Sequence, residues 1–467
     1  MTTRVMFVNA INPNSDVQQR YQPVSMAYLA SSLRCEFGQE YFRFKIIDRD
    51  FNKELKEFNP DIVGITSVSQ NYNIAKSYAR LAKESGVPVI VGGTHITAMP
   101  GSLTPYMDVG IVGEGERTVV ELFTLFENDG SFANTSKLER IPGLVYRKNG
   151  KISLTKPGEM ICPLDDILLP ARDLITIKET TYIFSSRGCP YRCEFCFSSR
   201  FWNKVRFFSA KYVIREIKEL IDLYKVKHIG FYDDLFIANR KRLRDLVTLI
   251  RGEGLDKKVS FSCSARADLV NDEVARLLKE MNVLFVSMGL ESGCNRTLRY
   301  LKGPGISVED NLNAVRTLKW FGIGAEGSFI IGSPQETREE ILETLDFIKE
   351  ADLHSFDVYL LTPLPGTPIW RLAKEKGLVS DNMDWDALNI NFLENQEKSI
   401  IISETLSRTE LYELFMLFET IRRKKVRKIL TRSLIQQGFQ KPYKVPGFLL
   451  RQVRKRLTAV TRRPNNW

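Results

Sequence analysis

The sequence alternates twice between short, apolar, β-branched runs and segments with a helical period, once in residues 1–130 and again from Thr181 onward. An alternation of this kind predicts a parallel sheet covered by helices. Parallel sheets collect ligand-binding side chains at the carboxyl ends of their strands. The 467 residues are enough for two or three domains, so we expect an α/β chain in which two sheets each present such an edge.

The first series predicts a doubly wound, Rossmann-like domain over residues 1–135. Residues 136–180 contain clusters of Asn, Ser, Gly and Pro, and are expected to be a linker with a small hairpin that turns at Asn149-Gly150. The predicted strands are Val5–Val8, Phe44–Ile47, Ile62–Thr66, Val87–Val91 and Val109–Val112, and the predicted helices are Met26–Leu33, Ile74–Ser85 and Thr118–Phe126.

The second series contains six strand–helix repeats over residues 181–375, which predicts a partial (β/α)6 TIM-like barrel instead of a full eight-fold one. Polar residues follow its strands directly, where barrel active sites are built. The predicted strands are Tyr182–Ser185, Lys227–Tyr232, Val259–Cys263, Leu284–Met288, Glu326–Ile331 and Phe356–Leu361.

Three cysteines with unequal gaps, Cys189, Cys193 and Cys196, lie on the loop after the first barrel strand. A cube of four irons held by three thiolates leaves one iron open to a substrate or cosubstrate, much as a catalytic zinc keeps an open position. The alternative is structural zinc, which ordinarily uses paired C-x2-C arms that this chain lacks. The seven cysteines are odd in number and scattered, which favours a reducing compartment.

The triplet, with the aromatic Phe195 before its last cysteine, resembles the radical S-adenosylmethionine (radical SAM) superfamily. The resemblance implies a [4Fe-4S] cluster on Cys189, Cys193 and Cys196, whose open iron chelates S-adenosylmethionine. It also implies reductive cleavage of that cosubstrate to a 5′-deoxyadenosyl radical, with an electron from an external donor such as flavodoxin or ferredoxin. The protein's own task is then to exclude water and to position the target hydrogen.

The barrel strand ends offer further candidate side chains, each with a plain alternative. The resemblance implies that Asp233 and Asp234 hold the ammonium of S-adenosylmethionine, although the Gly-Gly-Glu-like turn of the family is absent here; the alternative is that they cap the next helix. Arg266 suits the methionine carboxylate or else pairs with Asp268, and Glu291 suits the ribose diol or the amine or else belongs to a plain loop. The resemblance adds Phe195, Gly332 and Thr362 as cofactor contacts, the last two on the adenine side, whereas Cys263 and Cys294 are expected to be ordinary thiols.

The N-terminal series resembles the cobalamin-binding domain that precedes many radical SAM enzymes. The resemblance rests on Pro23, Tyr28-Leu29-Ala30, Gly92-Gly93-Thr94-His95 and Gly113-Glu114-Gly115-Glu116. It implies that cobalamin is bound by Ser67, Gly92, Gly93, His95, Gly113 and Glu114, where glycines let backbone amides approach a ligand. The Asp-x-His-x-x-Gly cobalt-ligand motif is absent, which leaves open a vestigial domain, a flat cofactor such as a flavin, or ordinary turns.

Residues 376–467 predict a helical, basic C-terminal extension. A helix over Leu406–Ile421 is expected to pack on the barrel or to roof its cavity. From Arg422 to Arg463 the chain holds 15 Lys and Arg, and no Asp or Glu follows Glu419. This tail is either a solvated helix face or a docking site for an anionic membrane surface. Binding of nucleic acid is the third alternative, since the sequence contains no recognised nucleic-acid-binding module.

With no signal architecture and no apolar run long enough to span a bilayer, we expect a cytoplasmic protein, with peripheral attachment to the inner membrane surface as an alternative. Together, the two resemblances imply a cobalamin-dependent radical SAM enzyme, which we expect to methylate an unactivated carbon of a small-molecule or lipid-like substrate. Enzymes with the same two domains also perform cyclisation or rearrangement, which is the first alternative. The second is a metal-stabilised binding protein without catalysis.

Overall fold

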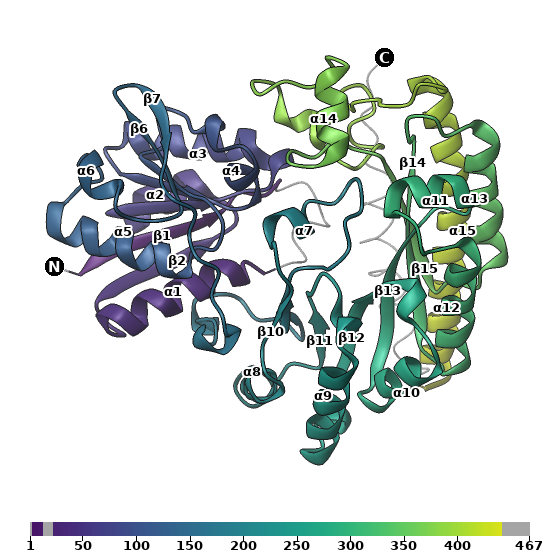
Figure 1. Ribbon diagram of the computed structural model, residues 1–467. Coiled ribbons are helices and arrows are strands. Elements are labelled where there is room, and N and C mark those ends of the chain that lie inside the picture. Colours follow the sequence, from purple (N-terminus) through teal and green to yellow (C-terminus); the bar gives the residue numbers. More distant parts are fainter. Residues whose placement is uncertain (1, 13–21, 441–467) are drawn as a thin grey trace.

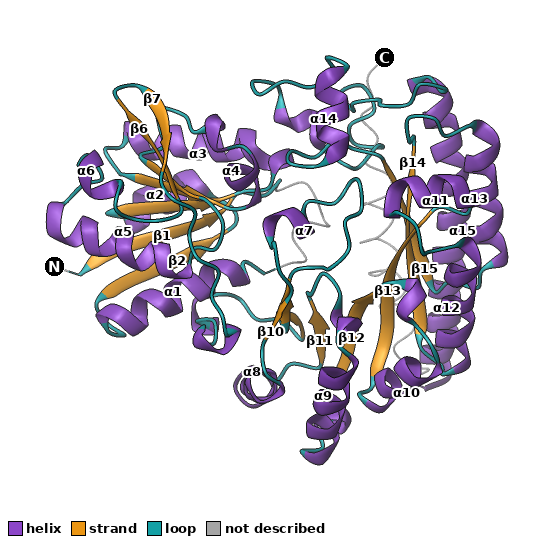
Figure 2. Cartoon of the chain, viewed as in Figure 1, coloured by secondary structure: helices purple, strands orange, loops and turns teal. Residues whose placement is uncertain are grey.

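Two α/β units and a C-terminal helical segment make up the computed structural model of the protein (Figure 1). The structure describes residues 2–12 and 22–440, with residues 428–440 described by their backbone alone. Each unit is built around one main sheet with helices outside it (Figure 2). The basic tail begins at Arg422, within the last described helix, and its part from residue 441 onward lies outside the described residues.

The first unit is a seven-stranded sheet with helices on both faces. Its elements are β1 (Thr3–Asn9), α1 (Val24–Phe37), β2 (Phe42–Ile47), α2 (Phe51–Phe58), β3 (Ile62–Thr66), α3 (Tyr72–Glu84), β4 (Val89–Gly92), α4 (Thr94–Ala98), β5 (Val109–Ile111), α5 (Glu116–Asp129), α6 (Thr135–Leu138), β6 (Leu144–Lys148) and β7 (Lys151–Leu154). The strand order is β2-β1-β3-β4-β5-β6-β7, and the first five strands are parallel.

Alternate side chains of β1 enter two different apolar layers. Val5 and Phe7 pack with residues of α1 and α5, whereas Met6 and Val8 pack with residues of α2 and α3. A strand buried on both faces reads as a continuous apolar run. The doubly wound architecture predicted from the sequence is therefore confirmed. Its chain order reverses between β1 and β3, the point where such sheets open a crevice beyond their strand ends.

The hairpin β6–β7 belongs to this sheet and is not a free linker. β6 pairs antiparallel with β5, with Val109 opposite Tyr146. Asn149 and Gly150 turn the hairpin with φ of 51° and 76°, the two positive values that a type I′ turn requires. The hairpin covers the edge that β5 would otherwise expose, so the sheet continues past residue 135 into the segment expected to be a linker.

The second unit is an open, six-stranded parallel sheet. Its elements are β8 (Thr180–Ile183), β9 (Ser186–Arg187), α7 (Ser198–Phe201), β10 (Arg206–Phe207), α8 (Ala210–Tyr224), β11 (His228–Phe231), α9 (Arg240–Gly252), β12 (Ser260–Ala265), α10 (Asp272–Glu280), β13 (Val283–Glu291), α11 (Asn295–Lys302), α12 (Val308–Trp320), β14 (Gly324–Ile331), α13 (Arg338–Glu350) and β15 (Ser355–Leu360). Its order is β15-β14-β13-β12-β11-β8, and the short β9 and β10 form a separate antiparallel pair. In the described part of the chain, β8 and β15 do not pair with each other, so the expected partial barrel is confirmed.

The C-terminal segment touches both units. It contains α14 (Pro368–Glu375), the 3-10 turn η9 (Trp385–Leu388) and α15 (Arg408–Gln440). Trp370 and Trp385 join an apolar cluster of the first unit. In α15, Leu411 and Phe415 join the barrel core, as expected for a helix that packs on the barrel, although this helix extends well beyond Ile421.

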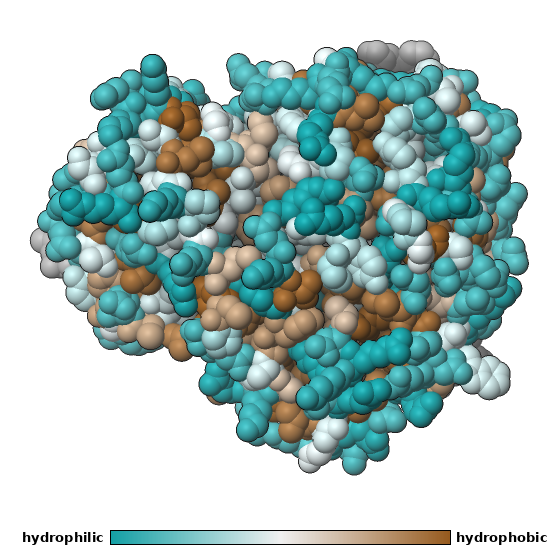
Figure 3. All heavy atoms as spheres, in the orientation of Figure 1, coloured by the Kyte–Doolittle hydropathy of each residue, from teal (hydrophilic) through white to brown (hydrophobic). Residues whose placement is uncertain are grey.

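None of the described helices has the length and apolar character to cross a membrane. Figure 3 shows hydrophilic residues over much of one face, with hydrophobic residues gathered in patches, several of them along the middle of the molecule.

Candidate active site at the facing strand ends

The cysteine loop begins after β9 and ends at α7. Gly188 opens it with φ of 98°, and a Cβ there would lie 2.7 Å from the carbonyl oxygen of Lys204, so only glycine fits. At the other end, Arg200 Nη1 donates to the carbonyl oxygens of Cys193 (3.0 Å) and Cys196 (2.5 Å). The loop backbone is thus fixed at both ends, and its three free thiols are partly exposed.

The loop offers three thiols and no fourth cysteine. Within residues 2–12 and 22–427, no group of three or more His, Cys, Asp or Glu side chains is arranged to bind a single metal ion. Structural zinc needs four ligands around one ion, whereas a four-iron cube binds each thiolate through a different iron. Burial raises the pKa of the Cys196 thiol to about 11, so binding of iron, which takes the thiolate, releases a proton. The donor set fits a cluster better than zinc.

Two neighbouring carboxylates after β11 have different surroundings. The N–H groups of Ser185 and Ser186 donate to Oδ1 of the buried Asp233 (2.6 and 3.1 Å), and their hydroxyls donate to its Oδ2 (2.6 Å each). A carboxylate has about four acceptor sites, so Asp233 is fully engaged as the anchor of the chain that leads to the cysteines. Asp234 is exposed and accepts a hydrogen bond from the N–H of Gly188 (3.2 Å).

A group of buried charges acts on the Cys193 thiol, namely Lys302, Glu291 and Arg266. Arg266 Nε donates to Asp268 (2.7 Å), and its guanidinium lies 3.9 Å from the ring centroid of Tyr191. Its Nη1 is buried without a partner. Pairing with Asp268 therefore uses one edge of the guanidinium and leaves a donor for an anionic ligand.

Glu291 ends β13 in a left-handed conformation, with φ of 61°. Such a backbone is uncommon for a non-glycine residue and clusters at ligand sites. Burial raises the pKa of Glu291 to about 7, although Lys302 and Arg266 act against it. Lys302 is itself buried at the end of α11, where its Nζ donates to the carbonyl oxygen of Gly289. Lys302 has no distinguishing signal in the sequence, because a lysine in the last turn of a helix is ordinary.

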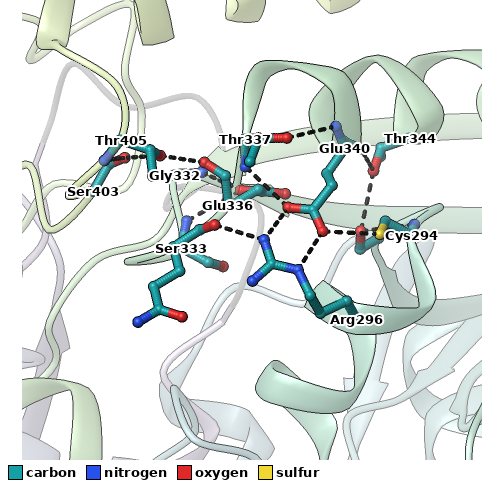
Figure 4. A network of polar contacts seen from close by, with 12 residues as sticks. Cys294, Arg296, Gly332, Ser333, Glu336, Thr337, Glu340, Thr344, Ser403 and Thr405 are labelled. Atoms are coloured by element: carbon teal, nitrogen blue, oxygen red, sulfur yellow. Dashed lines mark hydrogen bonds and ion pairs between the residues drawn. The ribbon is translucent and has the colours of Figure 1, made fainter.

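The turn after β14 is held by Glu336 (Figure 4). Its Oε2 accepts hydrogen bonds from the N–H groups of Gly332 (2.7 Å) and Ser333 (3.1 Å), while its Oε1 is buried without a partner. Burial raises the pKa of Glu336 to about 8. Thr405, from the C-terminal segment, donates to its carbonyl oxygen. Gly332 is thus positioned by an acid that sequence reasoning missed, although its place just before α13 offered a signal.

Phe195 packs beside Ile330 and Leu361 in a small apolar cluster at the ends of β14 and β15. Nearby in the chain, Thr362 donates from Oγ1 to the carbonyl oxygen of Leu360 (3.1 Å). Phe195 thus joins the cysteine loop to the strand ends where the adenine was expected.

The two remaining buried cysteines lie in ordinary surroundings. Cys263 is buried in the barrel core. Cys294 donates to Glu340 (3.3 Å), which also pairs with Arg296 (Figure 4).

The strand ends of the first sheet combine open glycines with an unpartnered hydroxyl. Ser67 Oγ is buried and has no partner. A Cβ built on Gly92 or Gly113 would meet no atom within 4 Å, so there is free space above β4 and β5. Gly93 has φ of 96°, and a Cβ there would collide with Thr66 Oγ1 at 2.4 Å. This edge fits a flat ligand that approaches the backbone closely.

His95 and Glu114 are engaged by the protein itself. Both ring nitrogens of His95 lie against serine hydroxyls, Nδ1 at 3.0 Å from Ser69 and Nε2 at 3.1 Å from Ser102, and burial lowers its pKa to about 3. The ring also stacks on Tyr72. Glu114 accepts hydrogen bonds from Arg187 and Arg206 of the second unit. Neither side chain offers a free donor or acceptor to a cofactor, so the structure assigns both to packing and pairing.

The two edges face each other, because α7, at the end of the cysteine loop, lies against α4, which starts at the glycine turn of the first sheet (Figure 1).

Residues 183–348 match the Radical SAM superfamily, and residues 14–123 match the B12 binding domain. A Pyrococcus horikoshii protein named as an uncharacterized methyltransferase is 37% identical over 385 residues, which are 78% of this chain and 80% of that protein. The chain is a radical SAM enzyme with a B12-binding domain.

Two further proteins are similar to this radical SAM enzyme, one in its solved structure and one in its sequence. The radical SAM methyltransferase TsrM from Kitasatospora setae, solved with cobalamin and a [4Fe-4S] cluster, superposes with a TM-score of 0.66 at 20% identity over 81% of this chain and 79% of that one. This likeness shows the fold. An anaerobic magnesium-protoporphyrin IX monomethyl ester cyclase of Cereibacter sphaeroides is 27% identical over 407 residues, which are 81% of this chain and 65% of the cyclase.

The three cofactors expected from the sequence are those of this family: a [4Fe-4S] cluster and S-adenosylmethionine for a radical SAM domain, and cobalamin for a B12-binding domain. The residues present fit them. Three partly exposed thiols share one loop, the unpartnered Nη1 of Arg266 lies near them, and the unpartnered Ser67 hydroxyl lies at an open, glycine-lined edge.

Proposed function

We propose that this radical SAM enzyme transfers a methyl group to an unactivated carbon of a small-molecule or lipid-like substrate bound between the two edges. The contact between α7 and α4 carries the proposal, because it brings the cysteine loop against the edge that suits cobalamin. When bound, the cluster supplies the electron that cleaves S-adenosylmethionine to a 5′-deoxyadenosyl radical, and cobalamin supplies the methyl group. The protein binds, orients and shields these groups from water.

The chain's own residues divide this work among them. Cys189, Cys193 and Cys196 hold the cluster. Arg266 Nη1 takes the methionine carboxylate, Asp234 takes the ammonium, and Glu291 takes the ribose diol. The remaining contacts are Phe195, Gly332 and Thr362 for S-adenosylmethionine, and Ser67, Gly92, Gly93 and Gly113 for cobalamin. Asp233, His95 and Glu114 are left out because their polar atoms are already engaged.

Methyl transfer is favoured over cyclisation because the relative at 37% identity is named as a methyltransferase, whereas the cyclase relative is 27% identical. Cyclisation stays the second candidate, since the cyclase matches 81% of this chain.

The proposal includes an external one-electron donor such as flavodoxin or ferredoxin, and a cytoplasmic location. Peripheral docking to an anionic membrane surface stays a prediction about the basic tail.

Anaerobic purification after reconstitution with iron, sulfide and cobalamin tests the proposal, with iron and cobalt counted per chain and the visible spectrum recorded. We expect about four irons and one cobalt in the wild type. Cys193→Ala should lose the cluster and the cleavage of S-adenosylmethionine, while Cys35→Ala, an exposed cysteine on α1, should keep both. Cleavage by Cys193→Ala contradicts the cluster assignment, and four irons without cobalt contradict the cobalamin assignment.

Methylation and cyclisation are then separated with S-adenosylmethionine that carries a labelled methyl group. Label in a substrate-derived product supports methyl transfer. A product formed with 5′-deoxyadenosine but without label supports cyclisation or rearrangement.

A further inference from the structure

A buried cluster of charges crosses from the first unit to the base of the cysteine loop. Glu114 follows β5, whereas Arg187 and Arg206 belong to the β9–β10 pair that precedes and follows the loop. Arg187 Nη1 donates to Glu114 Oε1 (2.6 Å), and Arg206 donates from Nη1 to Oε2 (2.8 Å) and from Nη2 to Oε1 (3.0 Å). These three side chains are only 5–8% exposed.

The geometry leaves Glu114 no capacity for a ligand. The N–H of Ile161 donates to Oε2 at 2.8 Å, so four donors occupy the roughly four acceptor sites of the carboxylate. Arg187 also pairs with Glu116, the first residue of α5. The carboxylates of the Gly113–Glu116 motif are therefore used for pairing between the units.

Aromatic rings hold the two guanidiniums in place. Trp202 lies 5.4 Å from Arg187 and 5.5 Å from Arg206, measured from its ring centroid, and Tyr28 of α1 lies 5.7 Å from Arg187. A planar guanidinium that donates from both terminal nitrogens to carboxylates and also lies over an aromatic ring has few alternative positions. The loop that carries the cysteines starts one residue after Arg187, at Gly188.

We propose that Glu114, Arg187 and Arg206 form an interdomain lock that fixes the cluster loop relative to the cobalamin edge. The inference rests on the proposed function, because it takes the cluster to be on the cysteines and cobalamin to be at the first sheet. The three are positioning residues: they contact neither cofactor, and they act through the loop and the β5 turn. Domains within one chain move relative to each other by default, and a misplacement of about 1 Å costs on the order of 100-fold in rate when reacting groups must meet.

The distance between the two cofactors tests the lock directly. In the reconstituted, reduced enzyme the cluster and cob(II)alamin are both paramagnetic, so pulsed dipolar EPR measures the distribution of distances between them. Glu114→Gln keeps the shape of the side chain and removes its charge, and Arg187→Lys keeps the charge and removes the planar fork. The control is Glu139→Gln, which breaks an exposed ion pair with Lys148 on the same unit.

We expect a narrow distribution in the wild type and in Glu139→Gln, and a broader or shifted one in Glu114→Gln and Arg187→Lys, with iron and cobalt counts unchanged. Either lock variant on its own is decisive if the other fails to fold. A wild-type distribution in a folded, fully loaded lock variant overturns the inference and leaves the proposed function standing. Loss of cobalamin from Glu114→Gln alone, with the distribution of Arg187→Lys unchanged, makes Glu114 a cofactor ligand and also overturns it. If the wild-type protein takes up no cobalt, the proposed function is overturned, and the inference that rests on it is overturned as well.

Discussion

Asp233 can either anchor the backbone before the cysteine loop or bind a ligand, and two substitutions at this position distinguish these roles by their effects on stability. Asp233→Ala leaves the N–H groups of Ser185 and Ser186 buried without an acceptor. Each such loss costs about 1–3 kcal/mol, so we predict a destabilisation of about 4 kcal/mol. At about 2–4 °C per kcal/mol for a domain of this size, the melting temperature of the barrel falls by about 8–16 °C.

Asp233→Asn is predicted to be mild. Its amide oxygen still accepts from both N–H groups, and the two serine hydroxyls can rotate to accept from its NH2 group. Only the charge is lost, which weakens the hydrogen bonds by about 1 kcal/mol in total. The fold before the cysteine loop, and with it the iron content, should be retained.

The assay is thermal unfolding before reconstitution, followed by iron content and affinity for S-adenosylmethionine. Asp234→Asn is the matched control, since Asp234 is exposed: we expect an unchanged melting temperature and weaker binding of S-adenosylmethionine. The reasoning is refuted if Asp233→Ala melts like the wild type. It is equally refuted if Asp233→Asn abolishes binding of S-adenosylmethionine at wild-type stability, because Asp233 would then be the ligand.

Three further predictions follow from buried contacts. Trp385→Ala removes a buried ring that lies edge-on to His95 at 4.5 Å and stacks on Trp370, so unfolding should cost about 3–5 kcal/mol less, and limited proteolysis should cut the C-terminal segment faster. Burial raises the pKa of Glu336 from the ordinary 4.5 to about 8 in the folded protein, so the folded chain binds an extra proton between these pH values, and the stability that this group contributes is lost as the pH rises from about 4.5 to about 8. The melting temperature of the wild type should therefore fall over this pH range, and Glu336→Gln should make the fall smaller. An equal fall in the variant contradicts the raised pKa of Glu336. Arg200→Ala frees the carbonyl groups of Cys193 and Cys196 and should lower retained iron, whereas Arg192→Ala, exposed on the same loop, should not.

The positions of the elements were largely predictable, because period and composition are local. The strand expected at Lys227–Tyr232 is His228–Phe231, and the helix expected at Ile74–Ser85 is Tyr72–Glu84. The Asn149-Gly150 turn was predictable for the same reason. The pairing of β6 with β5 was not, because it depends on which edge lies next to the hairpin in space.

The sequence was sufficient to predict that the candidate site lies at the strand ends, but it was not sufficient to predict which role each side chain has there. Asp233 and Asp234 are adjacent and chemically identical in the sequence, yet the N–H groups and hydroxyls of Ser185 and Ser186 saturate Asp233 and not Asp234. Lys302 carried no signal at all, since it stands on a helix and only the fold brings it near Cys193. Partner choice by buried polar groups is a tertiary property, and a single sequence does not contain it.

The Gly113–Glu116 motif shows why a cofactor-like motif can have two functions in a two-domain enzyme. Its edge must leave room for a ligand and must also meet the other domain. Gly113 serves the first need, because open space remains where its side chain would stand. Glu114 and Glu116 serve the second, because both pair with Arg187 close to the first cysteine. A buried carboxylate with two arginine partners is costly to separate, so the residues that look most like cofactor ligands are the ones that resist domain opening. Access to the space between the edges must then come from a side that this pairing does not close.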